Sequence, residues 1–314
     1  NISVNGSSTA HLQDNTVDAD NTATQASGTT SVQVATGSGT ATTTTVGESN
    51  GIVEQVLTIS GTFGKIDDLT IQDNDSAFEI AADITARESE TGVTADAITE
   101  VQLGTIDTPM TSGTVSFDIF TGDGGDSDGT KETISAQIPE DGDLSSLVSE
   151  INKRSGTTGV TAELTKDGTI KLTEPDGNDI AIDNYSHSNA GDMDVTAYTI
   201  DADNGDDDLS DAATETLSGT VTDEQVATRV TGRVDFHSSG TYTTSSSIDA
   251  SAGSIFGLDT DEVNGSESQK LSTVDISSAE GAQTAIQIID AALSQVSGFR
   301  GDLGAIQNRF DATI

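Results

Sequence analysis

The chain has 314 residues, of which 32% are hydrophobic and 4% are aromatic, both low shares for a globular protein. Twelve basic residues stand against 53 acidic ones, and the formal net charge is −41. A surface this acidic repels nucleic acid and anionic membranes, so neither is expected as a partner. The chain has no cysteine, which excludes disulfides and thiolate metal sites. No apolar run approaches the length of a membrane-spanning helix.

Residues 1–47 are polar and rich in threonine and serine, with a threonine run at 42–45 and weak strand alternation at 31–34. This composition predicts a Thr/Ser-rich segment of loose β structure or partial disorder.

The next segment, residues 48–110, is the first of two related β/α units. Its elements are predicted in the order strand, strand, helix, strand, at 56–59, 69–71, 76–87 and a last strand ending at Leu103. The helix keeps apolar residues at intervals of three and four, at Ile80, Ala81 and Ile84. The string TGVTA at 91–95 follows the helix, and its glycine suits a turn with positive φ.

Residues 111–194 repeat this order. Strands are predicted at 115–120, 132–138 and 169–173, and a helix at 144–153. A second TGVTA follows this helix at a matching interval, which indicates an internal repeat. The sequence SLVSEINKRSGTTGVTAEL resembles the IN motif of the outer domains of flagellins and hook-associated proteins, with Ile151-Asn152 as the naming pair. The first copy departs there, with Ile84-Thr85. We interpret the motif as one of packing, without chemistry of its own.

Residues 195–270 form a third β-rich region and a connector, with the clearest strand at 230–236. The last segment, residues 271–314, is predicted to be one long helix. Ser277 and Glu280 have capping-box spacing, and no proline follows them. An apolar seam with alternating steps of three and four runs through Ala285, Ile289, Ala292, Val296, Phe299, Leu303, Ile306 and Phe310. Such a seam implies partner helices that this sequence does not contain.

Within this seam, the strings EGAQTAI, IIDAAL and RGDLGAIQNRF resemble the carboxy-terminal core helix of bacterial flagellin. The predicted fold is therefore mainly β outer domains with short helices, as α+β repeats, and one long C-terminal α-helix of a helical-bundle core domain. The resemblance implies a structural subunit of the flagellar filament, active in swimming motility and assembled with other flagellin subunits. It implies an extracellular location, reached through the flagellar type III export system; no signal peptide opens the sequence.

The same resemblance implies an export chaperone and a cap protein as partners. It also implies recognition by Toll-like receptor 5, with Asn308 and Arg309 at most on the accessory side of that surface. This chain without amino-terminal core helices is expected to be monomeric. Two alternatives stay open: a hook–filament junction or filament cap protein, and a surface adhesin or carbohydrate-binding protein.

Catalytic, cofactor-binding and metal-binding residues are not predicted. The three histidines, His11, His187 and His237, have no zinc spacing, and His-Glu-x-x-His and Gly-x-Ser-x-Gly are absent. The acidic clusters at 123–128 and 201–211 have the oxygen density that calcium prefers, but the first does not fit EF-hand spacing. Both are interpreted as solvated loops. These patterns predict that the protein is not an enzyme.

Overall fold

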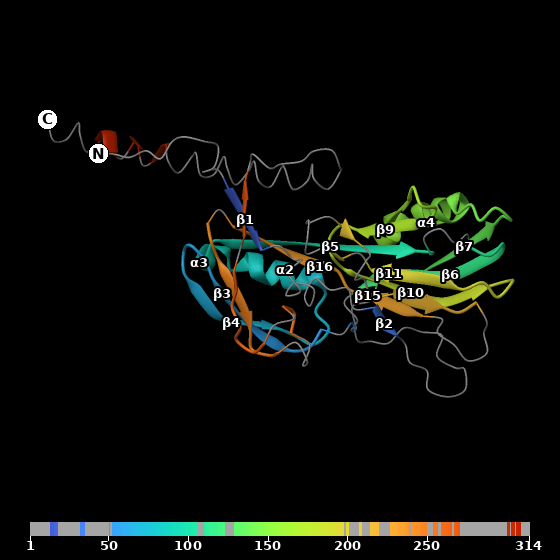
Figure 1. The fold of residues 1–314 in the computed structure, drawn as a ribbon, viewed down its shortest axis with the longest axis horizontal. Helices are drawn as coiled ribbons and strands as arrows, with labels where there is room; N and C mark the ends of the chain where they lie inside the picture. Colours follow the sequence, from blue (N-terminus) through green and yellow to red (C-terminus); the bar gives the residue numbers. More distant parts are fainter. Residues whose placement is uncertain are drawn as a thin grey trace.

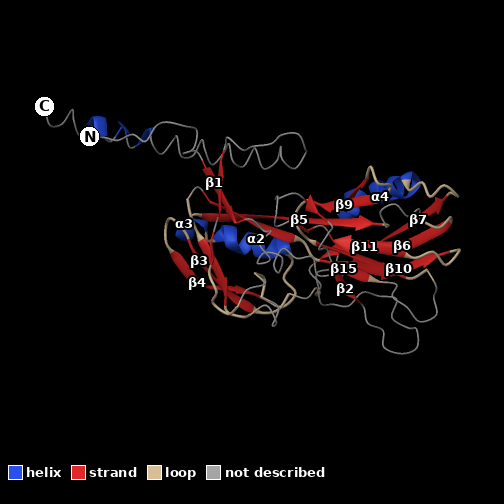
Figure 2. Ribbon diagram, viewed as in Figure 1, coloured by secondary structure: helices blue, strands red, loops and turns tan. Residues whose placement is uncertain are grey.

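A computed structural model describes most of the chain between residues 50 and 270 and a few residues near its carboxy-terminal end. The described residues are 13–17, 32–34, 50, 52–105, 110–122, 129–197, 199–200, 207–208, 214–219, 227–238, 240–249, 254–256, 259–265, 267–270, 300–301, 303–304 and 306–308. Antiparallel strands dominate them, with few and short helices (Figure 2). The prediction of mainly β domains with short helices is confirmed for this part of the chain.

The largest sheet has eight strands in the order β14-β11-β5-β16-β1-β19, with β9 also on β5 and β8 on β9. These strands are β14 (Thr214–Leu217), β11 (Met193–Ala197), β5 (Val93–Leu103), β16 (Arg233–Ser238), β1 (Gln13–Val17), β19 (Glu267–Lys270), β9 (Ile170–Glu174) and β8 (Thr161–Leu164). The β1–β19 pair, with Gln13 opposite Lys270, brings an early and a late segment of the chain together.

Three smaller sheets complete the described strands. The five-stranded sheet has the order β2 (Val32–Val34), β15 (Thr228–Val230), β10 (Asp179–His187), β6 (Gly113–Gly122), β7 (Glu132–Ile138). The four-stranded sheet has the order β18 (Asn264–Gly265), β17 (Thr243–Ser246), β3 (Gln55–Ser60), β4 (Lys65–Ile71). The two-stranded sheet pairs β12 (Thr199–Ile200) with β13 (Asp207–Asp208).

Short helices link a strand hairpin to the next strand in each unit. In the first unit, α2 (Ala77–Ala86) is followed by the single turn α3 (Glu88–Thr91), and Ser76 forms a capping box with Glu79. In the second unit, α4 (Ser145–Thr158) ends at Gly159, whose φ of 76° is left-handed. The sequence predicted that α4 ends near Lys153, five residues too early. The residues after Ile151 are polar and show no apolar periodicity, although the helix continues until Gly159 terminates it.

Two hydrophobic cores lie between the sheets. The first core packs the inner faces of β3, β4 and α2 against β5 and β16, with Leu57, Ile59, Ile71, Ile80, Ile84, Val93 and Phe236 among its members. The second core packs β6, β7, β10 and α4 against β5, β9 and β11, with Phe117, Ile134, Leu147, Ile151, Leu172, Ile182 and Val195 among its members. Burial of such side chains contributes about 1.5–3 kcal/mol each.

The long strand β5 belongs to both cores. Val93 and Ala95 lie in the first core, whereas Val101 and Leu103 lie in the second. Figure 1 shows β5 running from the part of the molecule that holds α2 to the part that holds α4. One continuous strand therefore contributes side chains to both cores.

The predicted strand at 230–236 is wrong, because the chain leaves one sheet for another in the middle of it. Val230 ends β15, which pairs with β10, and Arg233 begins β16, which pairs with β5. Between them, Gly232 lies so close to Thr99 that an added Cβ would be 2.3 Å from the threonine Oγ1. Strands from residues 193–265 contribute to both cores. The predicted unit boundaries at 47, 110, 194 and 270 stay a prediction.

Candidate functional site

The IN pair of the second unit joins a helix to the strand that follows it. Ile151 is 1% exposed in the second core, whereas the next side chain, Asn152, is exposed and faces β8. Its Nδ2 donates a hydrogen bond of 2.8 Å to the carbonyl oxygen of Ala162, and its Oδ1 accepts one of 2.8 Å from the Ala162 N–H. One amide side chain thus binds both main-chain groups of a single residue of β8.

The TGVTA turn between α4 and β8 is stabilised by its first threonine, Thr158. Thr158 Oγ1 donates to the carbonyl oxygen of Arg154 at 3.2 Å and accepts from the Val160 N–H at 3.2 Å. The Gly159 N–H completes the helix end by donating to the Ser155 carbonyl oxygen at 2.8 Å. Glycine reaches this left-handed conformation without the Cβ penalty, so the turn requires it.

The first unit makes the same contacts although it lacks the asparagine. Thr85 occupies the position of Asn152, and its Oγ1 donates to the Ala95 carbonyl oxygen at 3.0 Å and accepts from the Ala95 N–H at 2.9 Å. Thr91 closes the turn as Thr158 does, at 3.2 Å and 3.1 Å, and Gly92 has a φ of 77°. In the sequence, Thr85 is a departure from the IN motif. The structure shows that its hydroxyl bonds to both the N–H and the carbonyl oxygen of Ala95.

In each unit an ion pair also links the carboxy-terminal end of the helix to a neighbouring strand. In the first unit, Arg87 lies 2.8 Å from Asp68 of β4 and 2.5 Å from Glu90. The hydrogen bonds from these two carboxylates, Glu90 first, raise the pKa of the Arg87 guanidinium. In the second unit, Arg154 lies 3.2 Å from Glu132 of β7. All five side chains are at least partly exposed, so these pairs contribute little to stability.

The junction between the units is held by a shared carboxylate. Glu100 of β5 lies 2.8 Å from the Lys171 amine of β9 and 3.2 Å from the Arg233 guanidinium of β16. The Glu100 side chain is 9% exposed and the Arg233 side chain 10% exposed. Since β9 belongs to the second unit and β16 packs in the first core, Glu100 clamps the two units together. The sequence carried no signal for this contact.

The turn between β9 and β10 adds main-chain contacts to this junction. The N–H of Phe78 in the first turn of α2 donates to the Gly177 carbonyl oxygen at 3.0 Å, and Thr99 Oγ1 donates to the Asn178 carbonyl oxygen at 2.7 Å. The Asn178 N–H in turn donates to Glu174 at 2.6 Å. Burial is the main cause that raises the pKa of the Glu174 carboxyl.

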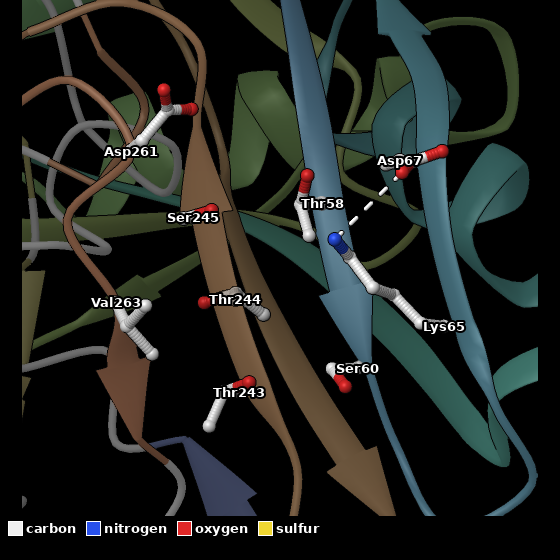
Figure 3. Close-up of a pocket in the computed structure, with 9 residues that line it drawn as sticks. All are labelled: Thr58, Ser60, Lys65, Asp67, Thr243, Thr244, Ser245, Asp261 and Val263. Atoms are coloured by element: carbon white, nitrogen blue, oxygen red, sulfur yellow. Dashed lines mark ion pairs between the residues drawn. The ribbon is translucent and has the colours of Figure 1, made fainter.

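An open groove lies on the outer face of the four-stranded sheet (Figure 3). Hydroxyl side chains of β3 and β17 form its floor, and Lys65 and Asp67 of β4, whose charged atoms are 3.7 Å apart, lie along one side. Asp261 and Val263 lie along the other side. The groove lining contains no histidine, and its two carboxylates, Asp67 and Asp261, lie on opposite sides of the floor.

Two histidines, His187 and His237, lie within the described residues, and both have polar contacts. His187 is 6% exposed; its Nδ1 accepts from the N–H groups of Asn189 and Gly191, and its Nε2 lies 2.9 Å from the Thr111 carbonyl oxygen. His237 lies 3.5 Å from Asp96. In the part of the chain that the structure describes, no group of three or more His, Asp or Glu side chains is arranged to hold a metal ion.

The predicted helical seam lies mostly outside the described residues. Leu303 and Ile306 are helical, and their side chains are 59% and 41% exposed. Asn308 is helical and exposed. The seam positions outside the described residues are Ala285, Ile289, Ala292, Val296, Phe299 and Phe310; Arg309, His11, 123–128 and most of 201–211 lie outside them too. Among the described helices, none is long and apolar enough to cross a membrane.

Comparison with known proteins agrees with this arrangement. The family model "Flagellin hook IN motif" matches residues 116–174, from β6 through α4 to the end of β9. A B-type flagellin of Pseudomonas aeruginosa is 32% identical over 209 residues, which are 65% of this chain and 38% of the relative. Flagellin E of Vibrio cholerae is 52% identical over 46 residues, and polar flagellin B/D of Vibrio parahaemolyticus is 52% identical over 42 residues.

The second β unit, closed by its helix-to-strand bridge, thus carries a flagellin hook IN motif. Over a larger part of its length the chain is similar to flagellins. It spans 38% of the length of the B-type flagellin and 12% and 11% of the two Vibrio flagellins.

Proposed function

We propose that this chain provides the solvent-facing outer units and the carboxy-terminal core helix of a filament subunit in swimming motility. The observation that carries the proposal is the match to a B-type flagellin over 65% of the chain. In such a subunit the outer units face the medium, where the net charge of −41 keeps neighbouring surfaces hydrated and apart.

Assembly is proposed to run through a long helix at residues 277–314. Its apolar seam would bundle with amino-terminal core helices and then pack between subunits. The exposed Leu303 and Ile306 support this, because each would gain about 1.5–3 kcal/mol on full burial. The β1–β19 pair supports it too, since it holds residues 13–16 beside residues 267–270 at the base of the outer units. Because these early and late segments of the chain lie side by side, the outer units can project from a helical core without interrupting it.

We also infer that residues 48–110 and 111–194 are two copies of one β/α unit. The matching contacts of Thr85 with Asn152, of Thr91 with Thr158 and of Gly92 with Gly159 support this inference. Within the described residues of both copies no catalytic arrangement is seen, and we propose that the units serve as spacers and surface.

The partners of the proposed subunit follow from its family. They are other flagellin subunits, an export chaperone, the cap protein at the growing tip and Toll-like receptor 5. Its location is the extracellular filament, reached by flagellar type III export. Without amino-terminal core helices, the chain itself is proposed to be monomeric.

A junction or cap protein is the nearest alternative, because the IN motif is described as a flagellin hook motif. The extended match to a flagellin favours the filament subunit. An adhesin would use the hydroxyl-lined groove of Figure 3, which offers no aromatic platform for a sugar ring. Deleting residues 51–265 separates these readings, since a filament protein should still polymerise and an adhesin should lose binding.

The test uses the complete gene product, purified as monomer, seeded with filament fragments and examined by negative-stain electron microscopy. Wild type should form long filaments, and Leu303→Asp should form none. The matched control is Leu164→Asp, which places the same charge on an exposed leucine of an outer strand and should polymerise normally. Failure of seeded wild type to polymerise would favour the junction, cap or adhesin readings.

A further inference from the structure

The strand β8 lies at an edge of the eight-stranded sheet. Its one neighbour among the described strands is β9, and it has only four residues. Along an antiparallel pair, successive residues direct their main-chain groups alternately toward and away from the neighbouring strand. Ala162 bonds to Asn152, so its groups point away from β9, and Leu164, two residues on, has the same orientation. The outer edge of β8 therefore consists of Ala162 and Leu164.

Such an edge can accept a further strand, and the first unit shows where. There Thr85 binds both main-chain groups of Ala95 on one edge of β5. From Thr99 to Leu103, the residues of β5 with the same orientation pair with β9. A strand thus joins the same edge four residues beyond the position that the helix side chain covers. In the second unit, the next outward-facing residue beyond Ala162 is Leu164, whose side chain is 41% exposed.

We propose that Asn152 closes the edge of β8 against addition of a strand from a second copy of this chain. By binding both groups of Ala162, it leaves Leu164 as the single outward-facing residue of the edge, which is too short to pair. Without the asparagine side chain, Ala162 and Leu164 form a two-residue edge beside an exposed leucine. Open edges of this kind template association between chains.

The second copy is the expected occupant because an antiparallel pair of β8 strands is self-complementary about a twofold axis, as homodimers require. The net charge of −41 opposes association at low salt, and screening removes part of that barrier.

The test compares the oligomeric state of the chain and of Asn152→Ala by sedimentation velocity from about 10 µM to about 1 mM, in about 0.15 M and about 1 M NaCl. The wild type should stay monomeric. Asn152→Ala should show a concentration-dependent rise toward about twice the monomer mass, stronger at high salt. Alanine at an exposed helix position favours the helix, so the variant should fold. If circular dichroism shows that it does not, Asn152→Val, which has the shape of threonine but no hydroxyl, replaces it in the same series.

Two further variants distinguish strand pairing at the β8 edge from nonspecific association. Asn152→Thr should stay monomeric, because Thr85 makes both hydrogen bonds from the equivalent position. Asn152→Ala combined with Leu164→Lys should return to monomer, because lysine on an edge strand opposes pairing. Its folded content should equal that of Asn152→Ala, since Leu164 is exposed.

Two outcomes would overturn the proposal. The first is a folded Asn152→Ala that stays monomeric at the highest concentration in high salt. The second is an association that Leu164→Lys leaves unchanged. Both measurements use the 314-residue chain in solution, so they do not depend on whether filaments form.

Discussion

Glu100 and Lys171 form an ion pair of 2.8 Å between β5 and β9, at the place where the two units of the chain meet. The same carboxylate binds Arg233 of β16 at 3.2 Å, and Arg233 also lies 3.4 Å from Asp235. In a chain with 12 basic and 53 acidic residues, two of the basic side chains converge on one buried acid. The junction is therefore specified by charge as well as by the continuous strand.

Glu100→Gln should lower the free energy of unfolding by about 2–3 kcal/mol, because it leaves Lys171 and Arg233 without their shared charge partner. This is below the range of about 3–5 kcal/mol for fully buried pairs, since the Lys171 side chain is 26% exposed. Urea unfolding followed by circular dichroism measures the change. Asp67→Asn, which removes the exposed Lys65–Asp67 pair, is the control and should cost at most about 1 kcal/mol. Equal effects of the two substitutions would show that Glu100 is not a clamp.

Thr85→Ala should destabilise the first unit by about 1 kcal/mol, the net value of the hydrogen bonds lost at Ala95. Thr85→Asn recreates the residue of the second unit and should retain most of the stability. Hydrogen exchange at the Ala95 amide reports the bond directly. That amide should exchange faster in Thr85→Ala and near the wild-type rate in Thr85→Asn; unchanged protection in Thr85→Ala would contradict the assignment.

Gly159→Ala should destabilise the second unit by about 1–2 kcal/mol, because a residue with a Cβ is strained at a φ of 76°. Its added Cβ would also lie 3.3 Å from Glu174. Gly156→Ala is the matched control within α4, where an added Cβ meets nothing within 4 Å. That substitution should stabilise by about 0.5–1 kcal/mol through helix propensity. Opposite shifts in thermal midpoint confirm the pair of predictions, whereas shifts of the same sign contradict them.

Glu174 should make stability fall as the pH rises. Burial raises the pKa of its carboxyl above the ordinary value of 4.5, so the folded state prefers the protonated form. Its stabilising contribution is complete below the unfolded pKa and is lost as the pH rises through the folded pKa. Glu174→Gln removes this loss, so the variant should gain stability relative to wild type between about pH 4.5 and pH 7.

The measurement for Glu174 is urea unfolding at a series of pH values for wild type, Glu174→Gln and Glu163→Gln. Glu163 is exposed on β8, and its substitution should give a difference from wild type that barely changes with pH. A flat difference for Glu174→Gln as well would exclude the buried carboxyl as a source of pH dependence.

Local patterns in the sequence predicted the local elements well. The apolar rhythm of Ile80 and Ile84 placed α2 within one residue at each end, and the predicted strand at 132–138 coincides with β7. These elements are set by neighbouring residues, through periodicity, capping and the left-handed glycine of TGVTA. The resemblance to flagellin depended likewise on short contiguous strings, and the IN motif match confirms that part of it.

By itself, then, the sequence determined the order of hairpin, helix and strand and the resemblance to flagellins. The tertiary structure alone decided which strands pair, the passage of β5 through both cores, the change of sheet at Gly232 and the meeting of Glu100 with Lys171 and Arg233. It alone revealed that Thr85 replaces an asparagine without loss of contacts. The physical reason is that periodicity and turn chemistry act between neighbours, whereas pairing and ion contacts join residues distant along the chain, whose proximity exists only after folding.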